Sequence, residues 1–167
     1  MNTNIKFFLL CPVPNDQKPI NEYINGKENL LTSWTTLSTK RYEKKIKSLF
    51  SLIFLFLSVV KFSTLQGIYY FSDWVFENCF FTMILLIFFF LIILSRWVQI
   101  DYRFTQARLF YEEASWYDGQ YWEKPLELIK NEKLISSQKI RPIIRRIQNT
   151  IIQLLFFAFL FFLLLQV

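Results

Sequence analysis

The sequence predicts an all-α membrane protein with three transmembrane helices, a cap of amphipathic helices on one membrane face, and a short aromatic β-hairpin within that cap. The 167-residue chain is 53% hydrophobic and 20% aromatic, which is typical of membrane proteins. Its net charge of +6 lies mainly in two blocks that apolar segments separate. In the second block, carboxylates and large aromatic residues surround an Asp-Gly pair, a frequent hairpin turn.

The first hydrophilic block, residues 1–47, carries 8 Lys/Arg and 4 Asp/Glu. Prolines and a glycine interrupt residues 1–37, which predicts a loop-rich arm with one short helix near residues 27–34. The stretch Cys11-Pro12-Val13-Pro14 is expected to be extended, because a proline disfavours helix in the residue before it. Several Lys and Arg residues end the block where the chain is predicted to enter the membrane.

Three apolar segments are predicted to cross the membrane. The first, residues 48–71, is long enough only if it includes Lys61, whose side chain then extends to the interface or forms an ion pair. Residues 72–95 comprise a short loop and the second span, in which an uncharged run from Cys79 covers about 26 Å at 1.5 Å per residue. The third span is residues 150–167.

The second hydrophilic block, residues 96–149, carries 10 Lys/Arg and 7 Asp/Glu. No proline interrupts residues 96–115, so the second transmembrane helix is expected to continue out of the membrane. Its apolar face would contain Ile100, Phe104, Ala107 and Tyr111. Pro125 is a favourable first helical residue, and an amphipathic helix is predicted after it from Leu126, Ile129, Leu134 and Ile135. Pro142 is expected to begin the last helix.

Both basic blocks are expected on the cytoplasmic or stromal side of the membrane, because Lys and Arg favour that side. With three spans, the N-terminus lies on that side and the C-terminus on the other. No basic groove with interleaved stacking residues is evident, so nucleic-acid binding is not expected.

The stretch from Tyr111 to Pro125 is the most distinctive part of the chain. Asp118-Gly119 predicts a tight hairpin turn, with Gly119 at positive φ and either Trp116 near Trp122 or Tyr117 near Tyr121. Three interpretations remain open: a self-packed structural turn, an aromatic patch that docks a partner, and a metal site. The metal site would use the hard oxygen ligands Glu112, Glu113 and Asp118.

Enzymatic activity is not expected. The chain contains no His, which removes the commonest general base and metal ligand, and Ser115 has no evident base. Its two cysteines, Cys11 and Cys79, lie in different regions, so neither a structural disulfide nor a zinc site is expected. Pigment binding is a further alternative, with Asn78 and Gln153 as chlorophyll ligands near the spans.

Three stretches resemble one known family, the plastid and cyanobacterial membrane proteins called hypothetical chloroplast reading frame thirty-six. Cys11-Pro12-Val13-Pro14, with Gln17, Pro19, Glu22 and Tyr23, resembles its opening. Tyr111-Glu112-Glu113, followed by Trp116-Tyr117-Asp118-Gly119-Gln120, Trp122, Lys124 and Pro125, resembles its central signature, and Arg141-Pro142 with Arg145 resembles the element before the last span. The resemblance implies a plastid membrane, with the thylakoid expected and the inner envelope left open, and it carries no established catalytic residue.

Together these observations predict a non-enzymatic integral membrane protein of the plastid that assists or assembles a thylakoid complex. The N-terminus would be stromal and the C-terminus lumenal, and the partners would be the lipid bilayer and a membrane protein complex. Metal handling with iron and pigment binding are the alternatives. The residues predicted to contact a partner are Cys11, Pro12, Pro14, Tyr111, Trp116, Tyr117, Asp118, Gly119, Gln120, Trp122, Lys124 and Pro125.

Overall fold

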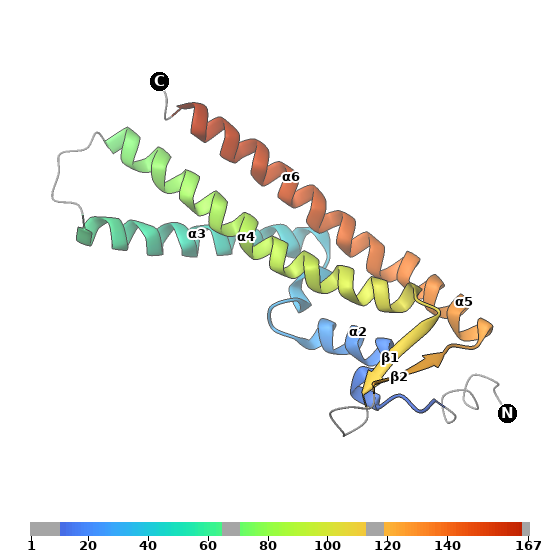
Figure 1. Ribbon diagram of the computed structural model, residues 1–167. Coiled ribbons are helices and arrows are strands. Elements are labelled where there is room, and N and C mark those ends of the chain that lie inside the picture. Colours follow the sequence, from blue (N-terminus) through green and yellow to red (C-terminus); the bar gives the residue numbers. More distant parts are fainter. Residues whose placement is uncertain (1–10, 65–70, 113–118, 165–167) are drawn as a thin grey trace. The chain divides into compact units, whose positions relative to one another are not determined.

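The computed structural model describes residues 11–64, 71–112 and 119–164, which are mostly helical and include one two-stranded sheet (Figure 1). In order, the elements are η1 (Asn15–Gln17), α2 (Pro19–Glu28), η2 (Ser33–Thr36), α3 (Thr39–Thr64), α4 (Phe71–Thr105), β1 (Arg108–Glu112), β2 (Gly119–Glu123), α5 (Leu126–Ile135), the π-helical turn η3 (Ser136–Ile140) and α6 (Arg141–Leu164).

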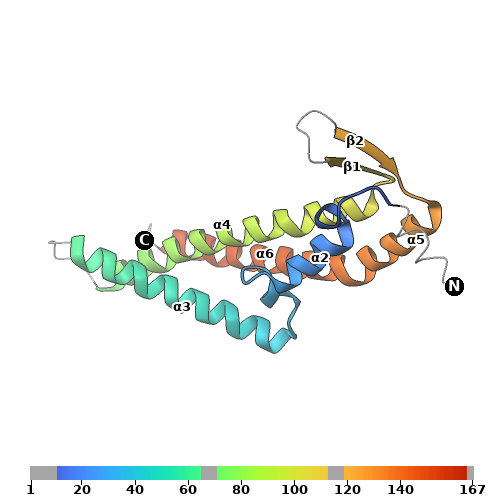
Figure 2. The same ribbon diagram turned by 90° about the horizontal axis from the view of Figure 1, so that it is seen from below.

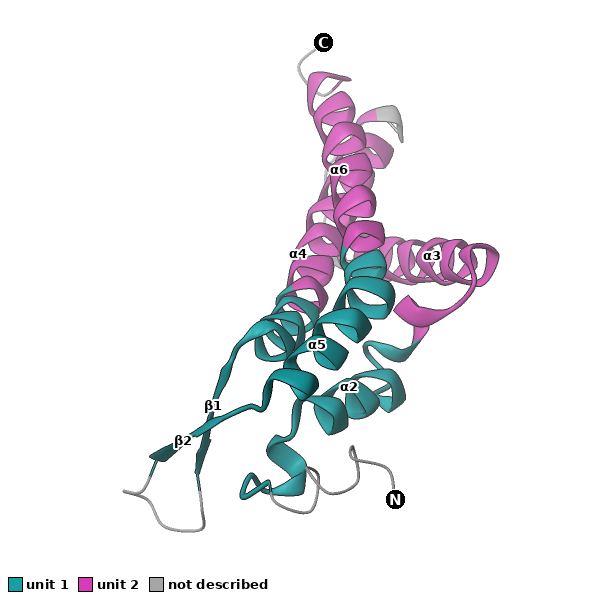
Figure 3. Ribbon diagram, turned by 90° about the vertical axis from the view of Figure 1, so that its right-hand side faces the viewer, with its two compact units in different colours: residues 1–33, 95–144 teal, residues 34–94, 145–167 magenta. Residues whose placement is uncertain are grey.

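The chain divides into two compact units, drawn in different colours in Figure 3. Unit 1 comprises residues 1–33 and 95–144, and unit 2 comprises residues 34–94 and 145–167. Unit 1 therefore contains α2, the last turns of α4, the β-hairpin and α5. Unit 2 contains α3 and the larger parts of α4 and α6.

In unit 1, α2 packs on the end of α4 through an aromatic cluster. The ring of Tyr23 meets Trp97 and Phe104 edge to face, with centroid distances of 6.1 and 6.2 Å. Trp97 and Phe104 are fully buried. The prediction of a short helix near residues 27–34 is wrong in its position, because the helix begins at Pro19, whose fixed φ suits the first helical turn.

The prediction that the second transmembrane helix continues past Arg96 is confirmed, but its extent toward residue 115 is wrong. The helix ends at Thr105 and the chain forms β1. In β1 burial alternates, with Leu109 and Tyr111 buried and Arg108, Phe110 and Glu112 exposed. By spacing, Phe104 and Tyr111 could lie on one face of a helix. Because residues 108–112 pair with β2, they form a strand instead, in which every second side chain is buried.

The region after β2 is continuously helical from α5 through α6, so Pro142 does not begin a separate helix. The wide turn of η3 precedes the proline, and the N–H of Arg141 bonds to the carbonyl of Ser136. Such a turn accommodates a ring that would clash with a regular helix. The predicted apolar face of α5 is wrong in part, since Leu126 and Leu134 are exposed and Glu132 is buried.

In unit 2, α4 and α6 run alongside each other and α3 lies at an angle to them (Figures 1 and 2). The segment before α3 is fastened to the bundle by Trp34, which stacks on Tyr42 at 5.4 Å and meets Phe90 edge to face at 5.7 Å. Nη1 of Arg146 donates a hydrogen bond to the carbonyl of Leu37 at 2.6 Å. These contacts hold the start of α3 against α4 and α6.

Two helical segments are long and apolar enough to cross a membrane, Asp73–Thr105 and Leu126–Leu164, where the sequence predicts three spans. In the second segment, charged residues recur up to Arg146, so the apolar part begins at Ile147. α3 does not qualify among the described residues, and its first turns are charged. Residues 72–78, expected to be a loop, are the first turns of α4.

Candidate functional site

The β-hairpin of unit 1 is the candidate site, and its register differs from the predicted one. The strands pair antiparallel, with Phe110 opposite Tyr121 and Leu109 opposite Trp122. Gly119 is the first residue of β2 and lies opposite Glu112, so it belongs to a strand and not to the predicted turn. The strand partners of Trp122 and Tyr121 in this register are thus residues of β1, while Trp116 and Tyr117, their predicted partners, lie outside the described residues.

Gly119 serves close packing rather than an unusual backbone conformation. Its φ is not positive, contrary to the prediction. A β-carbon at this position would overlap the ring of Phe110 on the opposite strand. The missing side chain therefore provides the space in which the Phe110 ring lies.

Replacing Gly119 with alanine is expected to displace the Phe110 ring and destabilise the hairpin by about 1 kcal/mol or less, because the far end of this 44% exposed ring can turn away. The double variant Gly119→Ala/Phe110→Ala removes the clash and should recover the cost of the glycine substitution. Urea-induced unfolding of the detergent-solubilised protein measures both. An equal loss from Gly119→Ala with and without Phe110 would show that the glycine has another role.

The inner face of the hairpin packs on the N-terminal segment. Leu109 and Tyr111 are buried with Val13, and Cys11 and Trp122 pack against this cluster. The hydroxyl of Tyr111 donates a hydrogen bond to Oε1 of Gln120 on β2 at 2.8 Å. Tyr111 and Trp122, predicted as partner contacts, thus form part of the core of unit 1.

The outer face of the hairpin carries the exposed aromatic residues. Phe110 and Tyr121 are 44% and 72% exposed, and their rings meet edge to face at 5.3 Å. Beside them, Arg108 and Glu123 form an ion pair at 2.8 Å. An aromatic pair rimmed by charges has the composition of a protein-binding surface.

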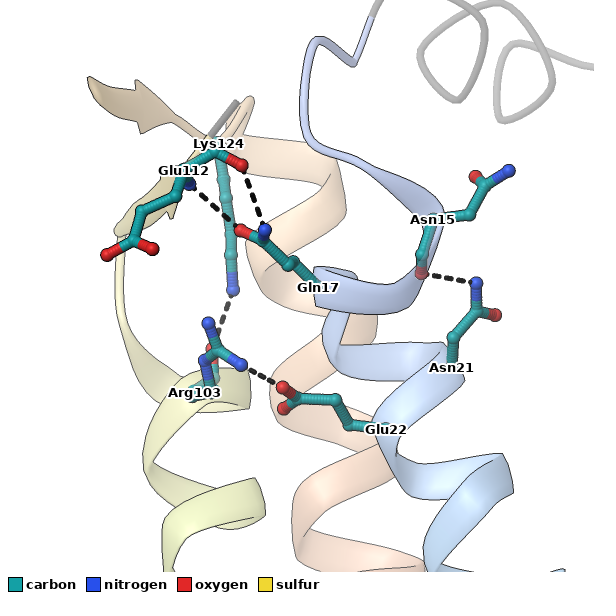
Figure 4. A network of polar contacts seen from close by, with 7 residues as sticks. All are labelled: Asn15, Gln17, Asn21, Glu22, Arg103, Glu112 and Lys124. Atoms are coloured by element: carbon teal, nitrogen blue, oxygen red, sulfur yellow. Dashed lines mark hydrogen bonds and ion pairs between the residues drawn. The ribbon is translucent and has the colours of Figure 1, made fainter. Parts of the chain in front are cut away.

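The outer edge of β1 is closed by the side chain of Gln17. Its Nε2 donates to the carbonyl of Glu112 at 2.9 Å, and the N–H of Glu112 donates to its Oε1 at 3.0 Å (Figure 4). The side-chain amide thereby replaces a neighbouring strand at this position. The N-terminal stretch and the hairpin stretch, far apart in sequence, form one structure.

A buried ion pair fixes the end of β2. Nζ of Lys124 donates to Oε2 of Glu132 at 2.5 Å. It also donates to the carbonyl of Arg103 at 2.8 Å (Figure 4). The side chain of Lys124 is fully buried and that of Glu132 is 10% exposed. Burial raises the pKa of the Glu132 carboxyl, and the hydrogen bond and charge of Lys124 oppose this change in part.

A second ion pair joins α2 to α4 in the same network. The guanidinium of Arg103 bonds to the carboxylate of Glu22 (Figure 4). Because the carbonyl of Arg103 also accepts from Lys124, the network connects α2, α4, β2 and α5. The base of the hairpin is thus held by groups on four elements.

The remaining residues predicted to contact a partner differ in their exposure. In the N-terminal stretch, Cys11 and Pro14 are half-buried and Pro12 is exposed. Gln120 is exposed and bonded to Tyr111, Pro125 is half-buried, and Lys124 is buried in its ion pair. Trp116, Tyr117 and Asp118 lie outside the described residues.

The exposed pair, Phe110 and Tyr121, is not among the residues predicted to contact a partner. Strand alternation through residues 108–112 would have indicated that Phe110 faces outward.

The predicted metal ligands are not brought together in the described part of the chain, where no group of three or more His, Cys, Asp or Glu lies close enough to hold a metal ion. The backbone of Glu112 is bound by Gln17, and its side chain is exposed. Glu113 and Asp118 lie outside the described residues. Metal binding therefore stays a prediction.

The two predicted pigment ligands lie in unit 2. Asn78 is fully buried, and its amide donates to Oγ of Ser58 at 2.7 Å. Its Oδ1 is buried and has no hydrogen-bond partner among the described residues. Gln153 lines an apolar hollow of about 450 Å³ in the same unit. Pigment binding also stays a prediction.

Comparison with known proteins finds matches over most of the chain. Residues 11–153 match the CGLD27-like family, described as Conserved in the green lineage and diatoms 27. The chain is 35% identical over 146 residues to the ycf36 protein of Porphyra purpurea, covering 84% of this chain and 86% of that protein. It is 32% identical over 144 residues to the chloroplastic protein Conserved in the green lineage and diatoms 27 of Arabidopsis thaliana, covering 84% of this chain and 43% of that protein. No solved structure matches the chain.

Proposed function

This chain belongs to the CGLD27-like family, and on that premise we propose that it is a non-enzymatic integral membrane protein of the plastid that assists or assembles a thylakoid complex. The chloroplastic name of the Arabidopsis relative supports the plastid location. The protein anchors itself through unit 2 and binds its partner through the outer face of the hairpin in unit 1.

The surface of unit 2 supports the membrane location. Large apolar side chains are exposed along its helices, among them Phe56, Phe62, Phe88, Phe156 and Phe159. A water-soluble protein rarely exposes so extended an apolar surface. Helices satisfy their backbone hydrogen bonds internally, so such a surface can face lipid.

A third crossing by α3 is part of the proposal. Its apolar residues are exposed, with Phe62 at 86% and Val59 at 69%. Nζ of Lys61 pairs with Oε2 of Glu77 on α4 at 2.8 Å, which reduces the cost of placing both charges near lipid. With three crossings and the basic blocks on the stromal side, the N-terminus is stromal and the C-terminus is lumenal.

One observation carries the docking role, namely the exposed Phe110–Tyr121 pair on a rigidly held hairpin. Aromatic anchors dominate many binding surfaces, and a surface fixed before binding loses less entropy on association. The buried cluster of Val13, Leu109 and Tyr111 holds the strands without any partner. Gln17 and Lys124 add hydrogen bonds and an ion pair to the same strands. Four elements of unit 1 thus serve to present two aromatic rings.

The experiment is affinity purification of the tagged full-length protein from mildly solubilised native membranes. The double variant Phe110→Ala/Tyr121→Ala is expected to lower recovery of the associated complex at least tenfold, the effect of losing two anchor residues. Tyr102→Ala removes a tyrosine that is 61% exposed on α4 of the same unit and should leave recovery unchanged. Equal recovery by both variants, or a lone monomer from the unaltered protein, would refute the docking role.

A further inference from the structure

A groove of about 280 Å³ with polar and apolar walls lies in unit 1 between α2 and the last turns of α4. Trp97 and Ile100 of α4 and Gly26 of α2 line it. The helices approach closely here, since a β-carbon on Gly26 would lie 3.3 Å from Cδ1 of Ile100. The Tyr23–Trp97 contact fixes the two walls, so the groove exists before any ligand binds.

The groove has one uncompensated positive charge. Its acidic residue, Glu22, is paired with Arg103. Arg96, also on the rim, is exposed and has no ion-pair or hydrogen-bond partner among the described residues. The side-chain amides of Asn25 and Gln99 are likewise exposed on the rim, and no described residue bonds to them. The rim therefore offers a guanidinium and two amides to a ligand.

The position of Arg96 in α4 indicates where the ligand comes from. Arg96 is the first charged residue after the uncharged run Cys79–Ser95 of the same helix. If α4 crosses the membrane as proposed above, this guanidinium lies at the level of the lipid headgroups. The inference therefore rests on the membrane location in the proposed function.

We propose that the groove binds the anionic headgroup of a membrane glycerolipid. Arg96 binds the phosphate or sulfonate through its planar fork of donors, which matches oxyanions well. Asn25 and Gln99 bond to headgroup hydroxyls, for which amides offer both donors and acceptors. A single unpaired cation suits one anionic group better than an acidic peptide. A soluble phosphate ester shares this chemistry, so the experiment separates the two sources.

The test is native mass spectrometry of the purified full-length protein with added phosphatidylglycerol or phosphatidylcholine. Phosphatidylglycerol should remain bound, and Arg96→Gln should weaken its binding about tenfold, which is the loss of one charge-assisted contact. Arg145→Gln makes the same charge change at an exposed arginine near the start of α6 and should have no effect. An equal loss in both variants indicates general charge attraction and overturns the proposal.

Two further arms separate the possible failures. Inorganic phosphate and glycerol 3-phosphate should not displace the lipid at equal concentration, and displacement would identify a soluble anion as the ligand and overturn the lipid assignment. Alkaline carbonate extraction of native membranes tests the membrane location by itself. Release of the protein contradicts the proposed function, whereas retention without a preference for phosphatidylglycerol contradicts only the headgroup site.

Discussion

Replacing Lys124 with alanine is expected to lower the free energy of unfolding by about 3–5 kcal/mol, the usual cost of leaving one partner of a buried ion pair alone. The side chain of Lys124 is fully buried and its only acidic partner among the described residues is Glu132. Removing it leaves the Glu132 carboxylate in a desolvated position. It also leaves the carbonyl of Arg103 without its side-chain donor. Urea unfolding followed by circular dichroism measures the change.

The loss of unfolding free energy in Lys124→Ala should increase as pH rises. Burial already raises the pKa of Glu132, and removing Lys124 takes away the groups that lower it. A carboxyl with a raised pKa in the folded state stabilises that state when protonated, and this contribution disappears as pH rises through the folded pKa. The cost of Lys124→Ala is therefore larger at pH 8 than at pH 5.

Two controls isolate the ion pair. Lys124→Met/Glu132→Leu replaces both charges with apolar groups of similar size and should recover most of the stability. Lys130→Ala removes an exposed lysine from α5 and should change stability by less than about 0.5 kcal/mol. If Lys124→Ala costs no more than Lys130→Ala at pH 8, the ion pair does not hold the hairpin.

Replacing Trp97 with alanine is expected to cost about 3–5 kcal/mol, because a fully buried large aromatic residue leaves a cavity that its surroundings fill only in part. The Trp97 ring contacts Tyr23 and lies under Gly26, so its loss also frees α2 from α4. Val98→Ala, at an adjacent position that is 45% exposed, is the matched control. Equal midpoints of urea unfolding for the two variants would contradict this packing.

The sequence predicts the helical class and the most apolar helix well, because long uncharged runs have few alternatives. α4 contains the whole run Cys79–Ser95. The family resemblance is likewise confirmed, as residues 11–153 match the family. The number of spans is less predictable, since α3 combines an apolar face with charged turns and Lys61.

The hairpin register was not predictable from local signals. Asp118-Gly119 is a strong turn signal, yet Gly119 is placed where the ring of Phe110 needs space, a contact that depends on the partner strand. Similarly, nothing near Gln17 in sequence indicates that its amide bonds to Glu112. Contacts between distant segments decide both positions, and periodicity does not encode them.

The burial of Lys124 was also not predictable, because a lysine after a hairpin normally extends into solvent. Its partner Glu132 is not among the residues of the apolar face predicted for α5. Only the fold brings the two side chains together. The candidate site is therefore predicted in its location along the chain but not in the residues that face outward.

The most direct test of the account places a photo-crosslinking amino acid at Tyr121 of the outer face or at Leu109 of the inner face in native membranes. Tyr121 is 72% exposed and Leu109 is 2% exposed. The account predicts that light links the Tyr121 position to a membrane protein of defined mass and that the Leu109 position yields only links within the chain. A partner that crosslinks from Leu109 and not from Tyr121 would contradict it.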